Sequence, residues 1–127
     1  MTTAPRVLIV DDNEVNVELA SFLLARAGMQ VAAALDAQRA LEQVESFAPD
    51  LILMDIQLPG RDGIALTRQL RSRPSARPLA IVAFTAYAMK GDKERFLAAG
   101  CDGYIAKPID VATFVDDVRA LLPAARP

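Results

Sequence analysis

The sequence predicts an α/β fold in which five parallel β-strands alternate with five helices that cover both faces of the sheet. Continuous apolar runs of strand length recur along the chain, which is the pattern of strands buried on both faces. Amphipathic helical stripes follow these runs in regular alternation, and that alternation requires parallel pairing with crossover helices. The length of 127 residues fits one domain of ordinary size.

The first part of the chain predicts a strand, a helix and a second strand. Residues 7–10 are continuously apolar, and residues 29–35 (MQVAAAL) form a weaker strand. Between them apolar side chains recur at helical spacing, and Gly28 suits a helix end. The stripe predicted to face the core comprises Val15, Leu19, Phe22, Leu23 and Ala27.

The middle of the chain repeats this theme. Asp36 suits the N-cap of a second helix, which Pro49 ends. Residues 51–55 (LILMD) are an apolar run that terminates in a carboxylate. Residues 59–60 (Pro-Gly) suit the central positions of a type II turn, and a third helix is predicted over residues 64–71.

The last part of the chain predicts two further strands and two helices. Residues 79–85 (LAIVAFT) form a strand, residues 88–99 a helix, and the segment from Gly103 to Lys107 a fifth strand. The last helix is predicted from the stripe Val111, Phe114, Val115, Val118, Leu121 and Leu122. Five parallel strands with right-handed crossovers favour the flavodoxin-like order 2-1-3-4-5.

Composition excludes several classes of function. The net charge of −2 argues against a general binder of nucleic acid or of anionic membranes. The absence of histidine excludes histidine-based catalysis and histidine metal ligands, and the single Cys101 excludes an internal disulfide. No signal peptide pattern or membrane-spanning apolar run is present, so the expected location is the cytoplasm.

Polar side chains stand where four of the predicted strands end. Because the carboxyl ends of parallel strands share one edge, and open α/β sheets bind ligands there, these side chains should converge. Carboxylates about 4 Å apart repel by about 4 kcal/mol at an effective dielectric near 20, so three together need protons or a cation to neutralise them. Oxygen ligands without cysteine or histidine select a hard cation such as Mg²⁺. Acids, Mg²⁺, a lysine and a hydroxyl make a site for phosphoryl transfer. The converging residues are Asp11, Asp12, Asp55, Thr85 and Lys107, with Asp55 as the best nucleophile because it stands alone on a central strand.

The segments LIVDDNE, DLILMDIQLPGRDG, AFTAYAMKGD and GYIAKP resemble the receiver domain of response regulators in two-component signalling. The resemblance covers Arg6 to Leu122, and within the family the chain is similar to DivK-type single-domain regulators. It implies a single receiver domain over residues 1–127, with a core at about 6–122 and no output domain.

This resemblance also implies partners. A sensor histidine kinase, a hybrid kinase or a histidine phosphotransfer protein would donate the phosphoryl group from a phosphohistidine. A downstream protein effector would read the switch through the fourth helix, fifth strand and fifth helix, with no direct contact to nucleic acid or membrane. The chain would catalyse only its own phosphorylation and dephosphorylation, and would act as a signalling switch, not as an enzyme with an independent substrate.

For the metal site, the resemblance implies specific roles. Asp55 would be the phosphoacceptor. Asp12 and Asp55 would bind Mg²⁺ directly together with the backbone carbonyl of Gln57, and Asp11 would assist through water.

For the switch, the resemblance assigns the remaining polar residues. Thr85 and Lys107 would hold the phosphoryl oxygens, and Tyr104 would turn inward when Thr85 moves. Pro108 would follow a cis peptide bond.

Three alternatives stay open at this point. A stand-alone Mg²⁺-dependent phosphohydrolase with an aspartyl-phosphate would usually carry a second carboxylate near the nucleophile and a cap domain, but Gln57 lies two residues after Asp55. A flavin carrier would need a phosphate-binding loop after the first strand, where this chain has two acids. A receiver used only for docking would be expected to lack an acid or the lysine, and this chain keeps both.

Overall fold

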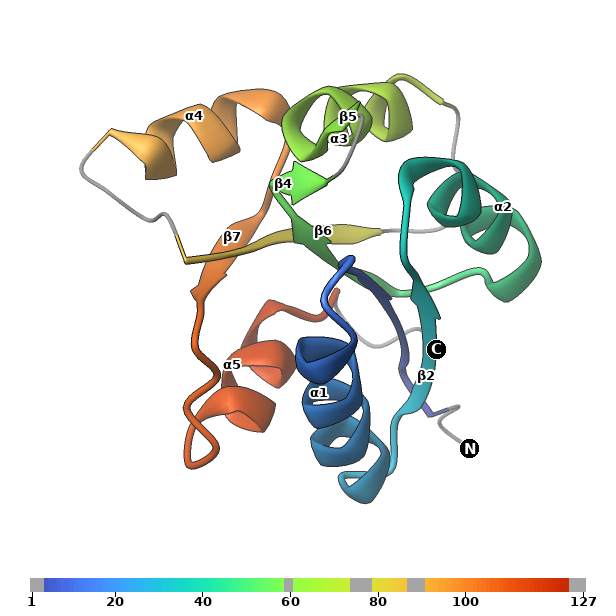
Figure 1. Cartoon of the computed structure of the whole chain (residues 1–127), viewed down its shortest axis with the longest axis vertical. Helices are drawn as coiled ribbons and strands as arrows, with labels where there is room; N and C mark the ends of the chain where they lie inside the picture. The colour runs from blue at the N-terminus through green and yellow to red at the C-terminus, as the bar shows by residue number, and fades with distance from the viewer. Residues whose placement is uncertain (1–3, 59–60, 74–78, 87–90, 124–127) are drawn as a thin grey trace.

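A parallel five-stranded sheet forms the centre of the molecule (Figure 1). The structure is a computed structural model that describes residues 4–58, 61–73, 79–86 and 91–123. The sheet has the order β2-β1-β3-β6-β7, which is 2-1-3-4-5 when only its own strands are counted, as predicted. Its strands are β1 (Arg6–Val10), β2 (Gln30–Ala34), β3 (Leu51–Asp55), β6 (Ala80–Thr85) and β7 (Gly103–Ala106).

A short antiparallel pair of strands, which the sequence did not predict, follows β3. It consists of β4 (Gln57–Leu58) and β5 (Arg61–Asp62). Because this pair is β4 and β5, the strand after β3 in the main sheet is β6. The predicted turn at residues 59–60 lies outside the described residues. The pair returns the chain so closely to β3 that a Cβ on Gly63 would lie 2.3 Å from the backbone oxygen of Asp55. Glycine is therefore required there for the chain to pass the end of β3.

Helices cover both faces of the sheet (Figure 1), because alternate strand residues face opposite sides. On one face lie α1 (Glu14–Arg26) and α5 (Phe114–Leu121). On the other lie α2 (Ala37–Phe47), α3 (Gly63–Ser72) and α4 (Asp92–Ala99). The first face buries Val7, Ile9, Leu53, Val82 and Phe84, and the second buries Leu8, Val10, Ile52, Met54 and Ile81. Among the described residues, no helix has the length and apolarity needed to cross a lipid bilayer.

The predicted core stripe of α1 is wrong for three of its five residues, although Leu23 packs against the core as predicted. Val15, Leu19 and Phe22 are exposed at 73%, 36% and 56%, whereas Ala20 and Leu24 are fully buried. The helix carries apolar residues on two stripes, and the small Ala20 allows it to lie close to the sheet. Spacing alone did not decide which stripe faces the sheet. The stripe of Val15, Leu19 and Phe22 is left on the surface.

The starts of the last two helices also differ from prediction. Among the described residues α4 begins at Asp92, after Gly91 with a φ of 95° that glycine adopts without strain; residues 88–90 lie outside the described part. Helix α5 begins only at Phe114, and Val111 lies in a turn at 60% exposure. That turn forms because the Asp110 carboxylate accepts a hydrogen bond from the backbone N–H of Ala112 at 3.0 Å.

Candidate functional site

Three carboxylates meet at the carboxyl ends of β1 and β3. Asp11 and Asp12 directly follow β1, and Asp55 is the last residue of the neighbouring strand β3. Carboxylate oxygens of the three residues all lie within 4.8 Å of one another. Asp11 is fully buried, Asp55 is 6% exposed and Asp12 faces solvent. The predicted convergence of these acids is therefore confirmed by their placement.

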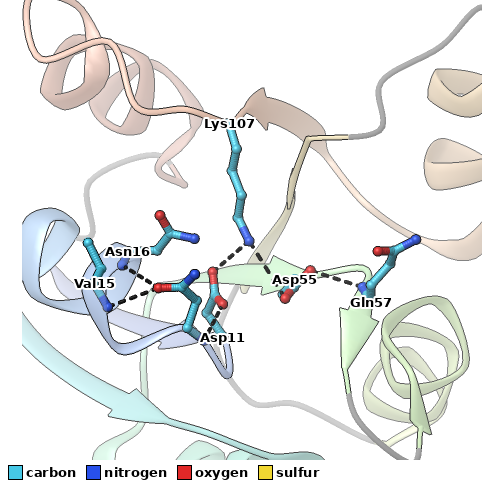
Figure 2. A network of polar contacts seen from close by, with 7 residues as sticks. Asp11, Val15, Asn16, Asp55, Gln57 and Lys107 are labelled. Carbon is cyan, nitrogen blue, oxygen red and sulfur yellow. Dashed lines mark hydrogen bonds and ion pairs between the residues drawn. The ribbon is translucent and has the colours of Figure 1, made fainter.

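Lys107 directly follows the edge strand β7, and its side chain extends toward the acids. Its Nζ lies 2.7 Å from Oδ2 of Asp11 and 3.6 Å from Oδ2 of Asp55, and Figure 2 shows the side chain pointing between the two carboxylates. Among the described side chains, one ammonium faces three carboxylates, so the cluster carries a net charge of −2 when all four groups are ionised. The site is thus electrostatically suited to receive a cation.

Backbone hydrogen bonds fix the orientation of both buried acids. Oδ1 of Asp11 accepts from the backbone N–H of Asn13 at 2.8 Å, and Oδ1 of Asp55 accepts from that of Gln57 at 2.9 Å (Figure 2). The Oδ2 atom of Asp11 is buried at ion-pair distance from Lys107, but no donor in the described part of the chain meets hydrogen-bond geometry with it. The 2.7 Å separation makes the contact an ion pair, because charge attraction needs little alignment, and the oxygen retains capacity for another ligand.

Burial raises the pKa of the Asp55 carboxyl above its ordinary value of 3.8. The hydrogen bond from Gln57 and the charge of Lys107 act in the opposite direction and lower this pKa. The nearby charges of Asp11 and Asp12 raise it further. Ionising Asp55 therefore costs more free energy in the folded protein than in water, and a further positive charge at the cluster would lower that cost.

Asn13 is a contributor to the site that the sequence reasoning missed. Its side-chain oxygen caps α1 by accepting from the N–H groups of Val15 at 3.0 Å and Asn16 at 3.2 Å, while its own N–H donates to the Asp11 carboxylate. An asparagine immediately before a helical stripe is the signal that could have identified this cap. The start of α1 and the orientation of Asp11 are thus set by one residue.

The remaining predicted site residues lie along or beside the same edge. Thr85 ends β6 and is buried, and its backbone oxygen accepts from the N–H of Lys107 at 2.9 Å. The Lys107–Pro108 peptide bond is cis, as the resemblance implied. Tyr104 lies within β7 at 38% exposure, opposite Ala83 in the register and three residues before Lys107.

The oxygen donors of the three acids, without sulfur or nitrogen ligands, are the set that hard divalent cations prefer. A carboxylate beside such a cation, with an ammonium 3.6 Å away, can accept an electrophilic phosphoryl group, because positive charge surrounds the oxygens on which negative charge gathers.

Comparison with known proteins agrees with this geometry. Residues 7–119 match the family model described as "Response regulator receiver domain". The chain is 40% identical over 116 residues to the polar-differentiation response regulator DivK of Brucella anthropi, which covers 91% of this chain and 94% of that protein.

Solved structures give the same picture. The chemotaxis response regulator CheY4 of Vibrio cholerae superposes with a TM-score of 0.88 at 26% identity, covering 94% of this chain and 100% of that one. A chain in the co-crystal structure of the Saccharomyces cerevisiae histidine phosphotransfer signaling protein Ypd1 and the receiver domain of its downstream response regulator Ssk1 superposes with a TM-score of 0.83 at 29% identity, covering 95% of this chain and 90% of that one. The match to the family model spans nearly the whole chain, so the protein belongs to the response regulator receiver domain family of two-component signalling.

Proposed function

We propose that this chain is a phosphorylation switch in which Asp55 accepts a phosphoryl group from the phosphohistidine of a partner protein in a Mg²⁺-dependent reaction. The observation that carries the proposal is the meeting of Asp11, Asp12 and Asp55 within 4.8 Å, with Lys107 directed at them from the far side of the sheet edge. We infer that it acts only on itself, as a single receiver domain over residues 1–127. A cytoplasmic location, expected from the sequence, is part of the same proposal.

The donor set fits Mg²⁺. Asp12 and Asp55 would hold the ion directly with the backbone carbonyl of Gln57, and Asp11 would assist through water. The buried Oδ2 of Asp11, which has no aligned hydrogen-bond donor in the described residues, supports this assignment. When bound, Mg²⁺ would offset the negative charge of the acids and of the incoming phosphoryl oxygens.

In the proposed step, a carboxylate oxygen of Asp55 attacks the phosphorus atom of the phosphohistidine. An O–P bond forms as the P–N bond breaks, and the electron pair of that bond returns to the imidazole of the donor. Lys107 and the hydroxyl of Thr85 would stabilise the phosphoryl oxygens. Water later cleaves the acyl phosphate, which restores the carboxylate and releases inorganic phosphate.

The exposed stripe of α1 supports a helical donor as the partner. Val15, Leu19 and Phe22 follow one another at helical spacing on the solvent side, and α1 begins two residues after Asp12. A protein docked on this stripe would have its phosphohistidine beside the acid cluster. We therefore propose as donor a histidine phosphotransfer protein, a sensor histidine kinase or a hybrid kinase. The solved complex of Ypd1 with the receiver domain of Ssk1 is a related case.

On the output side, we propose that a downstream protein effector reads the surface formed by α4, β7 and α5. Leu97 and Tyr104 are large apolar or aromatic side chains exposed on it, at 47% and 38%. Helix α4 is short and its N-cap Gly91 offers no side-chain hydrogen bond, so this element resists displacement less than a capped helix would.

The test is incubation with a small phosphodonor and Mg²⁺, followed by intact mass measurement. Wild type should gain one phosphoryl group only when Mg²⁺ is present, and Asp55→Asn should gain none. Asp36→Asn is the matched control, because it removes an acid that caps α2 outside the cluster and should react like wild type. An adduct on Asp55→Asn at the wild-type level would remove Asp55 from its proposed role.

A further inference from the structure

Phe84 is a buried aromatic ring at the border of the acid cluster, and neither the sequence reasoning nor the proposed reaction uses it. It is fully buried in β6 and lies opposite Asp55 in the strand register. The Nζ atom of Lys107 lies 4.9 Å from the centre of its ring, within the range of a cation–π interaction.

The ring is itself held in place from α5. Phe114 packs against Phe84 with ring centres 6.2 Å apart and an angle of 39° between the planes, and it is 1% exposed. Close packing of both rings leaves Phe84 no room to turn away from the lysine. Lys107 therefore has a fixed aromatic surface on one side and two carboxylates on the other.

Lys107 needs such a support, because its four-carbon stem is flexible and its nearest charge partner is not the phosphoacceptor. Nζ lies 2.7 Å from Asp11 but 3.6 Å from Asp55. Without the ring, the ammonium could move fully onto Asp11 or turn into solvent, since 14% of the side chain is already exposed. With the ring, it stays between the two acids.

We propose that Phe84, braced by Phe114, is a positioning residue that keeps Lys107 directed at the oxygens of the group on Asp55. This inference rests on the proposed function for its catalytic consequence, but the contact itself can be tested without phosphorylation.

The first experiment measures the reactivity of lysines in the metal-free protein. An amine-acylating reagent is added briefly, and Lys107 and the exposed Lys93 on α4 are quantified by peptide mass spectrometry, with Lys93 as internal standard. Phe84→Leu keeps an apolar side chain but removes the aromatic face, so acylation of Lys107 relative to Lys93 should rise about 3-fold or more. Phe84→Met should behave in the same way. Unchanged reactivity of Lys107 in both variants would overturn the inference.

The matched control is Phe96→Leu. Phe96 is 2% exposed in the core on the opposite face of the sheet, so this variant loses a comparable buried ring that does not touch Lys107. It should leave the acylation of Lys107 unchanged. An equal rise in Phe96→Leu would mean that general loosening is responsible, and the inference would fail.

The second experiment measures the rate of phosphorylation from a small phosphodonor at saturating Mg²⁺. Phe84→Leu should slow the reaction about 3- to 10-fold, and Phe96→Leu less than about 2-fold. In a Lys107→Met background, Phe84→Leu should cause no further slowing, because a positioning residue has no effect without the residue it positions. The same slowing in both backgrounds would contradict the inference while leaving Asp55 as the acceptor. If wild type takes up no phosphoryl group, the proposed function fails, and the acylation result still decides whether Phe84 holds Lys107.

Discussion

At the scale of single residues, the ionised carboxylate of Asp55 is electrostatically unfavourable in the folded protein. Burial and the neighbouring acids raise the pKa of its carboxyl, and the hydrogen bond from Gln57 and the charge of Lys107 only partly oppose this. The folded protein therefore binds the proton of Asp55 more tightly than the unfolded chain does. This sign determines how stability must depend on pH.

Asp55→Asn, which cannot ionise at this position, should gain stability relative to wild type as the pH rises. The stabilising contribution of a carboxyl with a raised pKa is complete below its unfolded value of about 3.8 and is lost as the pH rises through the folded value. The measurement is urea unfolding of both proteins, free of metal, from about pH 3 to about pH 7. If the stability of wild type instead rose relative to that of Asp55→Asn with rising pH, the raised pKa would be contradicted.

Residue identity alone predicted the acids and the lysine of the site, because charged side chains at the ends of apolar runs are conspicuous. Asn13 and Phe84 were missed for different reasons. Asn13 acts through its backbone N–H as well as its side chain, and Phe84 lies within a run where every residue is apolar. Its contact with Lys107 depends on the pairing of β6 with β7, which a local pattern does not contain.

At the scale of elements, the C-terminal end of α4 is held by Arg71, the last-turn cation of α3. The guanidinium donates to the backbone oxygens of Gly100 at 2.8 Å and Leu79 at 2.6 Å and pairs with Asp102. Asp102 in turn accepts from the N–H of Ile81 at 2.9 Å. One side chain thus joins α3, β6 and the turn before β7, at the end of the sheet opposite the acid cluster.

Arg71→Met should lower the free energy of unfolding by about 1–2 kcal/mol, because two carbonyls and Asp102 lose a charged donor that is partly exposed. Amide exchange should rise at the end of α4 and at the start of β6. Arg73→Met is the matched control, since Arg73 joins only the exposed Glu45 among the described contacts and should cost less than about 1 kcal/mol. An equal loss of unfolding free energy in the two variants would show that Arg71 contributes no more to stability than an exposed ion pair does.

The helices also show the limit of periodicity at this scale. In α1 three residues of the predicted core stripe, Val15, Leu19 and Phe22, face solvent. Leu23, in the same predicted stripe, packs against the core. In α5 it began the stripe at Val111, which lies in the turn held by Asp110. Periodicity located both helices correctly, but it did not determine which stripe meets the sheet or where capping stops the helix.

At the scale of the whole molecule, the fold followed from the sequence because buried parallel strands leave a strong local signal. β1, β3 and β6 read as apolar runs, and their order follows from connection rules that apply to any such chain. The pair β4–β5 was missed because strands of two residues have no periodicity to detect.

A switch of the proposed kind should connect the acid cluster to the α4–β7 side of the molecule. Saturation with Mg²⁺ and a stable phosphoryl mimic should change amide exchange in residues 91–106 and leave α2 unchanged as an internal reference. The measurement is hydrogen–deuterium exchange followed by mass spectrometry. Unchanged protection across residues 91–106 would contradict a switch that works through α4 and β7.

The central claim is that acids from two strands form one Mg²⁺ site. Its most direct test is a calorimetric titration of the metal-free protein with Mg²⁺. Wild type and Asp36→Asn should bind one ion with the same affinity, and Asp12→Asn and Asp55→Asn should bind at least about 10-fold more weakly. Absence of saturable binding to wild type, or equal affinity in all four proteins, would contradict the account.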